Sequence, residues 1–489
     1  MDSLYTGLVE TMSTIPPIPF PLRSDSYKLT HWRQYPPGTT EVYSYLESRG
    51  GQFPQTVFFG LQPYLRSYLA GPVVTAEGVA TADRLAAAHF GRPGIFNPAG
   101  WMHIVERHGG RLPVEVRAVA EGTPVPTHNV LMTIRNTDPA CYWLTNFLET
   151  LLLKVWYPTT VATLSGAILH VLEAAMKRSG EDPAPANMML HDFGYRGASS
   201  EETAGLGGAA HLVHFRTSDT LMANMVLREH YAGPGTPSDW MPSTSVVATE
   251  HSTMTAWGRD HEIDAYRNVL SEYPEGILSI VVDSFDVYRA AEEMFGGVLH
   301  EQVLARDGLL VLRPDSGDPV QVLLRLLPAL AGRFGSTRNH AGYKLLHPKV
   351  RLLWGDGIGL ESVERILDNL LAERWSAANL IFGMGGALLQ KVNRDSQKFA
   401  FKCSSATVNG ELRDVFKEPI TDPGKDSKRG KLALVRTEHG LETVHCPDNC
   451  EMEGDLLEPV FRNGEVLRHQ TLDDVRTRAA SSLSQNTTS

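Results

Sequence analysis

The stretch His191-Asp192-Phe193-Gly194-Tyr195-Arg196-Gly197 lies between two different structural signals. The residues before it, Met188-Met189-Leu190, form a short apolar run bounded by turn residues, which predicts a buried strand. Ser199 and Glu202, which follow it, have the spacing of a capping box and predict the start of a helix. We therefore expect a strand-to-helix loop, in which backbone N–H groups face outward and favour anions.

The side chains of this loop suit a flat ring next to a phosphate group. Phe193 and Tyr195 offer aromatic faces, and Arg196 offers a forked cation that matches phosphate. This combination indicates an enzyme that acts on a nucleotide with an aromatic base.

The alternation of a predicted strand with a predicted helix repeats through the second half of the chain. Short apolar runs end at charged or glycine-rich residues, and amphipathic stretches such as 319–334 and 360–374 separate most of them. A repeat of roughly 30 residues is typical of a (β/α)8 barrel, whose active site lies at the carboxyl ends of the strands, although an open doubly wound sheet would share it. The apolar runs are 188–190, 212–215, 245–248, 277–282, 309–312, 350–354 and 380–382.

The flanking segments predict a second unit. Alternating residues at 41–47, 112–119 and 129–134 predict strands, and 142–156 reads as a helix that is apolar on most sides. We therefore expect an α/β protein with an irregular (β/α) barrel and an accompanying α+β sheet domain built from N- and C-terminal segments.

The expected boundaries follow from these patterns and from two hairpin signals, Asn409-Gly410 and Asn463-Gly464. The segments are a flexible tail (1–20), the α+β domain (21–180), the barrel (181–404), C-terminal strands that pack on the first domain (405–475) and a disordered tail (476–489).

Composition narrows the class of protein. The chain has 489 residues and a formal net charge of −11, which does not favour binding to nucleic acid or to an anionic membrane. Four cysteines argue against a disulfide framework, and Cys446 and Cys450 lack a second pair of zinc ligands. The start of the chain does not read as a signal peptide, so we expect a cytoplasmic protein.

Charged residues at the ends of the predicted strands are candidates for chemistry. The Asp219 carboxylate could accept hydrogen bonds from a carboxamide, or it could cap the next helix. His251 could act as a base, a phosphate donor or a nucleophile, with Asp283 orienting its ring, or it could serve packing or capping. Asp315, two residues after Arg313, could hold ribose hydroxyls or stabilise positive charge on a sugar.

Two glycine-rich loops complete the candidate site. Gly355-Asp356-Gly357 and Gly385-Gly386 allow close approach of the backbone to a phosphate group. Arg394 and Lys402 follow them and favour a cradle for a 5′-phosphate.

Over nearly its whole length the chain resembles the nicotinamide phosphoribosyltransferases, the type II branch of the nicotinate and nicotinamide phosphoribosyltransferase family. The resemblance rests on blocks spread along the sequence: 136–139, 141–146, 191–197, 250–253, 313–317, 355–357 and 401–404.

The resemblance implies that nicotinamide attacks C1 of phosphoribosyl pyrophosphate (PRPP), giving nicotinamide mononucleotide and pyrophosphate. It implies Mg²⁺ as a cofactor, with ligands that the sequence does not identify. It also implies ATP as a co-substrate, hydrolysed through a phosphorylated histidine that corresponds to His251. A homodimer with shared active sites is expected, in which Tyr27 of one subunit and Phe193 of the other enclose the pyridine ring.

The resemblance also assigns roles to individual residues. The catalytic residues are His251, Asp283 and Asp315. The substrate-binding residues are Tyr27, Arg49, Phe193, Arg196, Asp219, Ser279, Arg313, Gly355, Asp356, Gly385, Gly386, Arg394 and Lys402.

The chain departs from the family pattern where a Ser-Gly-Gly-Gly loop reads Met384-Gly385-Gly386-Ala387, which adds a Cβ to the expected phosphate cradle. Two other functions stay open: a nicotinate phosphoribosyltransferase on the same scaffold, and a non-enzymatic binding or signalling protein. Asp219 argues against nicotinate, because two carboxylates in contact repel each other.

Overall fold

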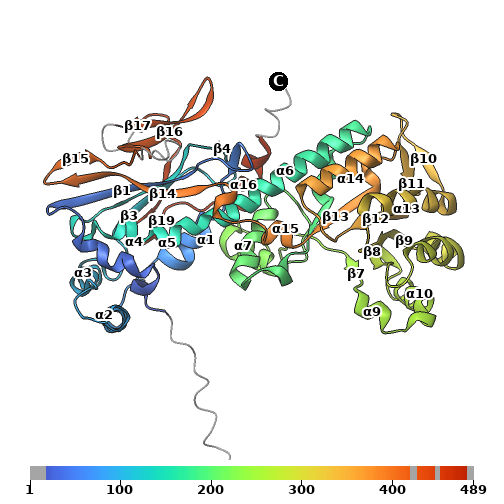
Figure 1. Ribbon diagram of the computed structural model, residues 1–489, viewed down its shortest axis with the longest axis horizontal. Helices are drawn as coiled ribbons and strands as arrows, with labels where there is room; N and C mark the ends of the chain where they lie inside the picture. Colours follow the sequence, from blue (N-terminus) through green and yellow to red (C-terminus); the bar gives the residue numbers. More distant parts are fainter. Residues whose placement is uncertain (1–17, 419–426, 447–451, 482–489) are drawn as a thin grey trace, which may run out of the picture.

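The computed structural model describes residues 18–418, 427–446 and 452–481. Two β-sheets lie at opposite ends of an elongated molecule, and the long helix α6 (Trp156–Arg178) runs between them (Figure 1). One sheet is antiparallel and the other is parallel, which confirms the expected combination of an α+β domain and a (β/α) barrel.

The antiparallel sheet has seven strands in the order β15-β14-β1-β5-β3-β18-β19. The N-terminal strands β1, β5 and β3 form its centre, and C-terminal strands flank them on both sides, because β1 pairs with β14 and β3 pairs with β18. Both predicted hairpins are present, since Asn409 and Asn463 have φ angles of 51° and 50° in the two-residue turns. The strands are β1 (Thr39–Ser48), β3 (Val114–Ala118), β5 (Val130–Asn136), β14 (Phe399–Val408), β15 (Glu411–Asp414), β18 (Glu458–Arg462) and β19 (Glu465–Val466).

The parallel sheet has the order β6-β13-β12-β9-β8-β7. Its first strand in the chain pairs with its last, and parallel bridges from Asp192 to Ser218 and from Thr217 to Thr244 continue the circuit towards β7. The strands therefore curl into an irregular barrel. They are β6 (Leu190–Asp192), β7 (Val247–Ala248), β8 (Glu275–Val281), β9 (Asp307–Arg313), β12 (Val350–Trp354) and β13 (Leu380–Met384).

Helices follow the barrel strands as the sequence predicted. The 319–334 prediction matches α13 (Pro319–Phe334), because Asp318 caps its first turn and Gly335, at a φ of 86°, ends it. The other helices of the barrel half are α7 (Glu201–His211), α8 (Leu221–Tyr231), α9 (His251–Thr255), α10 (Glu262–Glu272), α11 (Val287–Arg289), η9 (Ala290–Val298), α12 (His300–Ala305), α14 (Leu360–Ala372) and α15 (Gly386–Leu389).

Two local predictions were wrong. The strand expected at 188–190 starts only at Leu190, because a 3₁₀ turn precedes it. Residues 212–215 are a buried turn that follows α7, since an apolar run alone does not separate a strand from other buried segments. The buried helix expected at 142–156 is present as consecutive helical segments, which include α4 (Leu144–Phe147) and α5 (Glu149–Leu152) and lead into α6.

Two expected boundaries also differ from the structure. The boundary at residue 404 falls inside β14, which pairs with β1 in the antiparallel sheet. The tail expected from 476 is helical up to Ser481, because α16 (Leu472–Ser481) buries Val475 and Ala479. Residues 1–17 and 482–489 of the expected tails, like Cys450, lie outside the described residues, whereas Phe20 is buried in a 3₁₀ turn.

The segment Leu144–Arg178 is long and apolar enough to cross a membrane by composition alone. In the folded protein, 72% of its most apolar window is buried, and α6 packs against α7 and α14. It is therefore a core helix that joins the two halves of the molecule.

A buried carboxylate also connects the two halves. Glu121 accepts hydrogen bonds from the backbone N–H groups of Gly60 and Gln62, at 3.0 and 2.7 Å, and from the hydroxyl of Tyr231 on α8. We expect Glu121→Gln to lower the free energy of unfolding by about 3 kcal/mol, because the amide NH₂ would face groups that also donate. Denaturant titration measures this change.

The control is Glu77→Gln, which changes an exposed carboxylate in the first turn of α2 (Ala76–Phe90). A loss for Glu121→Gln as small as that of the control would show that this carboxylate does not hold the two halves together.

Candidate functional site

A cavity of about 740 Å³ opens at the carboxyl ends of the parallel strands. It gathers loops that follow β6, β7, β9, β12 and β13. Nine of the predicted site residues line it: Phe193, Arg196, Asp219, Arg313, Asp315, Gly355, Asp356, Gly385 and Gly386.

The Phe193 ring lies against the ends of two neighbouring strands. A Cβ added to Gly383 would meet the ring at 2.0 Å, and one added to Gly355 would meet it at 3.4 Å. The backbone N–H of Phe193 donates to the carbonyl of Met384 at 2.9 Å, which holds the loop in place. Gly383 is a site residue that we did not predict, and its signal is a glycine at the end of an apolar strand.

Asp192 fixes the loops on both sides of the ring, and its role was also missed. One carboxylate oxygen accepts the Gly194 N–H at 2.8 Å, and the other accepts the Ser218 hydroxyl at 3.1 Å. The backbone carbonyl of Asp192 accepts the N–H of Asp219 at 3.0 Å. Burial raises the pKa of Asp192, so these donated hydrogen bonds are needed to keep its carboxylate in place.

Asp219 is available to a ligand. The helix after it, α8, has Thr220 as its N-cap residue, and the Asp219 carboxylate accepts instead from the Ser245 hydroxyl. The capping alternative is therefore not realised, and an exposed carboxylate faces the cavity near Phe193.

The predicted contact between His251 and Asp283 is present. His251 Nε2 and an Asp283 carboxylate oxygen are 3.0 Å apart, and the imidazole is 45% exposed whereas the carboxylate is only 6% exposed. Asp283 can therefore orient the ring while the rest of the imidazole stays accessible.

Carboxylates and cations are mixed at the mouth of the barrel. Burial raises the pKa of Asp315, Arg313 and His251 lower it, and the negative charges of Asp283 and Asp356 raise it. These charged side chains therefore act electrostatically on the Asp315 carboxylate.

Ser279 Oγ and Arg313 Nε are buried and have no hydrogen-bond partner among the described residues.

Seven predicted site residues are not among those that line the cavity: Tyr27, Arg49, His251, Ser279, Asp283, Arg394 and Lys402. Arg49 and Lys402 lie on the antiparallel sheet side, where burial lowers the pKa of Lys402 and the charges of Arg49 and Arg394 lower it further. Tyr27 is 56% exposed. The structure therefore places a second, basic group of residues apart from the ring slot within one chain.

Lys391 was missed by the sequence reading. It lines the cavity, and its backbone N–H donates to the Gly386 carbonyl at 2.8 Å. Its only sequence signal is a cation shortly after the Gly385-Gly386 loop. Ala387, which replaces a glycine of the expected cradle, also lines the cavity.

The sequence matches two family models: the nicotinate phosphoribosyltransferase (NAPRTase) family over residues 188–465, and the N-terminal domain of nicotinamide phosphoribosyltransferase over residues 20–116. The chain belongs to the nicotinate phosphoribosyltransferase family. A relative from Xanthomonas campestris named nicotinamide phosphoribosyltransferase is 48% identical over 470 residues, which cover 94% of this chain and 97% of the relative.

Solved structures share the fold of this nicotinate phosphoribosyltransferase family member. A nicotinate-nucleotide pyrophosphorylase from Pyrococcus furiosus has a TM-score of 0.60 at 15% identity and covers 96% of this chain and 97% of its own. Human nicotinic acid phosphoribosyltransferase has a TM-score of 0.53 at 17% identity and covers 94% of each chain.

Asp192 offers a direct test of how this family member positions the base. We expect Asp192→Asn to reduce phosphoribosyl transfer by about tenfold or more, because an amide NH₂ would face Gly194 N–H or Ser218 and shift the loop of Phe193. Steady-state kinetics of the purified protein measure this loss. The matched control is Asp182→Asn, whose side chain contacts only a local exposed turn. Equal rates for the two variants would contradict a positioning role.

Proposed function

We propose that the protein transfers the phosphoribosyl group of PRPP to nicotinamide, giving nicotinamide mononucleotide and pyrophosphate. The observation that carries this proposal is the Asp219 carboxylate, which faces the cavity beside the Phe193 ring and does not cap a helix. It can accept hydrogen bonds from a carboxamide NH₂, and it repels the carboxylate of nicotinate. The name and 48% identity of the Xanthomonas relative support the same base.

In this reaction the pyridine nitrogen forms a bond to C1 of the ribose as the bond from C1 to pyrophosphate breaks. The half-buried Asp315 carboxylate suits the positive charge that develops on the sugar. Arg196, Arg313 and Lys391 line the cavity and suit the negative charge of the departing pyrophosphate. The glycines of the 355–357 and 385–386 loops allow the backbone to approach a phosphate group.

The donor set at the barrel mouth fits Mg²⁺. Asp283, Asp315 and Asp356 supply carboxylate oxygens, which this hard cation prefers, and they influence one another electrostatically. These carboxylates would hold Mg²⁺, which when bound supplies neutralisation of pyrophosphate charge.

We extend the proposal to ATP as a co-substrate that phosphorylates His251. Asp283 holds Nε2 of the ring at 3.0 Å, which favours the tautomer with the proton on Nε2. Nδ1 then carries the lone pair and attacks the terminal phosphorus of ATP, whose bond to the bridging oxygen breaks and releases ADP. The 45% exposure of the imidazole gives that phosphate access.

In a homodimer, predicted site residues that lie apart from the cavity of their own chain would complete the site of the other subunit. The exposed Tyr27 ring of one subunit would cover the pyridine ring that rests on Phe193 of the other. The cations Arg49, Arg394 and Lys402 would then face the phosphate of the same shared site. The cytoplasm, where nucleotide substrates are available, is the proposed location.

The choice of base is tested at Asp219. We expect the wild-type protein to convert isotope-labelled nicotinamide into its mononucleotide, and Asp219→Asn or Asp219→Ser to raise kcat/KM for nicotinate by about tenfold, because the like-charge repulsion is removed. Rates with both bases are measured for each variant.

The control is Asp260→Asn, which neutralises an exposed carboxylate in the 3₁₀ turn at Arg259–His261. Unchanged selectivity in both Asp219 variants would refute the assignment of the base. A protein with no turnover of either base at saturating substrate would favour the non-enzymatic alternative.

The shared site is tested by mixing two inactive variants. In a mixed dimer of Tyr27→Ala and Phe193→Ala subunits, one of the two sites keeps both rings, so random mixing should restore about a quarter of wild-type activity. Activity is measured after the subunits have been unfolded together and refolded.

The control mixture is Phe193→Ala with Asp219→Ala, whose changes fall on the same side of each site, so that no intact site can form. If the Tyr27 and Phe193 mixture regains no more activity than this control, Tyr27 acts within its own chain or not at all.

A further inference from the structure

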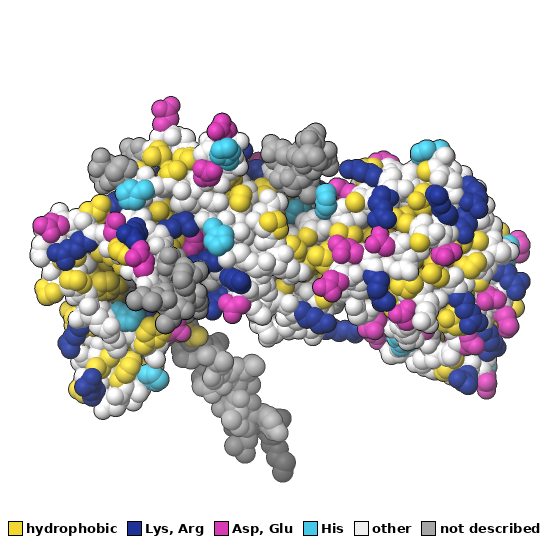
Figure 2. Space-filling model, turned by 45° about the horizontal axis from the view of Figure 1, so that its top comes forward, with side chains coloured by type: hydrophobic (Ala, Val, Ile, Leu, Met, Phe, Trp, Pro, Cys, Tyr) yellow, Lys and Arg dark blue, Asp and Glu magenta, His cyan; other side chains and the backbone are white. Residues whose placement is uncertain are grey.

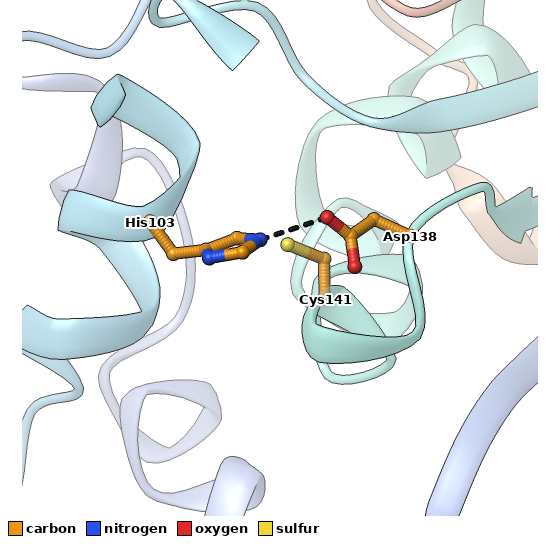
Figure 3. A group of neighbouring side chains, drawn as sticks. All are labelled: His103, Asp138 and Cys141. Atoms are coloured by element: carbon orange, nitrogen blue, oxygen red, sulfur yellow. Dashed lines mark hydrogen bonds and ion pairs between the residues drawn. The ribbon is translucent and has the colours of Figure 1, made fainter. Parts of the chain in front are cut away.

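A group of side chains of the types that bind metal ions lies far from the cavity, beside the antiparallel sheet. His103, Asp138 and Cys141 place one donor atom each within 4.8 Å of the others, as Figure 3 shows. His108 joins them, since both His103 Nε2 and His108 Nε2 lie within hydrogen-bond distance of the same Asp138 oxygen, at 2.8 and 2.7 Å. Both imidazoles therefore contact one carboxylate, and the thiol lies beside that carboxylate and the His103 ring.

The backbone holds these side chains in place. Asp138 and Cys141 share one 3₁₀ turn, in which the second Asp138 oxygen accepts the Ala140 N–H at 2.8 Å and the Asp138 carbonyl accepts the Cys141 N–H at 2.9 Å. Asn136 Nδ2 donates to the same Asp138 carbonyl at 2.9 Å. The turn is therefore a rigid platform for a carboxylate and a thiol.

The two histidines come from the middle and the last residue of α3 (Pro98–His108), which packs firmly against the same region. Trp101 of this helix is buried and contacts the rings of Trp143 and Phe147 at centroid distances of 4.8 and 5.0 Å. Because Trp143 follows Cys141 by two residues, this contact fixes the helix relative to the turn.

We propose that His103, His108, Asp138 and Cys141 bind a divalent transition-metal ion, with Zn²⁺ as the best match, and that this ion fastens α3 to the turn at 138–141. Imidazole, thiolate and carboxylate donors suit Zn²⁺, and four of them complete a tetrahedral structural site. The carboxylate and the thiolate together balance the charge of the ion. Mg²⁺ does not suit this set, because it prefers oxygen donors.

Binding changes the protonation of two kinds of side chain. The Cys141 thiol loses its proton to solvent as the bond from sulfur to the metal forms. Each histidine moves its proton from Nε2 to Nδ1, so that Nε2 can donate its lone pair to the metal instead of an N–H to Asp138. One proton is therefore released to solvent for each ion that binds.

The test uses the full chain without an affinity tag, dialysed against a chelator and then titrated with Zn²⁺ alone in a calorimeter. We expect one ion per chain, a rise in melting temperature, and an affinity at least about 100-fold weaker in His103→Gln. This side chain is 32% exposed, so its replacement leaves the core intact. The matched control is His89→Gln, an exposed histidine in the last turn of α2, which should bind as the wild type does.

Titration with Co²⁺ adds a direct probe of the sulfur ligand. We expect a thiolate-to-cobalt charge-transfer band in the wild type and its loss in Cys141→Ser, while His89→Gln keeps it. The proposal is overturned if Zn²⁺ gives no saturable binding, or if His103→Gln binds as tightly as the control. Either result would leave a hydrogen-bonded carboxylate with two histidines and no metal.

Discussion

The pairing of β6 with β13 is the constraint on which the barrel and its cavity depend. Leu190, His191 and Asp192 pair with Phe382, Gly383 and Met384, so the first strand of the barrel closes against the last. This register places the Phe193 ring on the bare backbone of Gly383. Without closure, the loops of residues 193–197 and 385–387 would not share one rim.

Local charge, and not the net charge of −11, decides what this rim can hold. Basic and acidic side chains are interspersed over the barrel half of the face seen in Figure 2. At the mouth of the barrel the same mixture becomes specific: Asp219 stands beside the ring slot, while Arg196, Arg313 and Lys391 line the rest of the cavity. A neutral amide and a phosphorylated sugar fit such an arrangement better than an acid does.

The antiparallel sheet contributes more than support. Its strand β14 returns from the barrel and pairs with β1, which brings Lys402 near Arg49 and builds a basic group outside the cavity. On another part of this domain, α3 and the turn at 138–141 bring four possible metal ligands together. In both cases the antiparallel domain brings together residues that are far apart in the chain.

The sequence by itself determined the kinds of element and most of the candidate site. Alternation predicted β1, amphipathic periodicity with Asp318 and Gly335 predicted α13, and the turns at 409–410 and 463–464 predicted hairpins, because these signals are local. The sequence also predicted that charged residues at strand ends would lie close together, since parallel strands bring their carboxyl ends to one edge. Whether an apolar run was a strand or a buried turn was decided only by the fold, as residues 212–215 illustrate.

Tertiary structure alone decided the long-range contacts. The sequence could not show that Thr220, and not Asp219, would be the N-cap residue of α8, or that the Asp219 carboxylate would face the cavity. The position of this carboxylate depends on the neighbouring strand and on the hydrogen bond from Ser245. Nor could it show that His103 and His108 would meet Asp138, or that Asp192 would hold two loops. These contacts join residues whose separation along the chain carries no periodic signal, so only the packing of distant elements determines them.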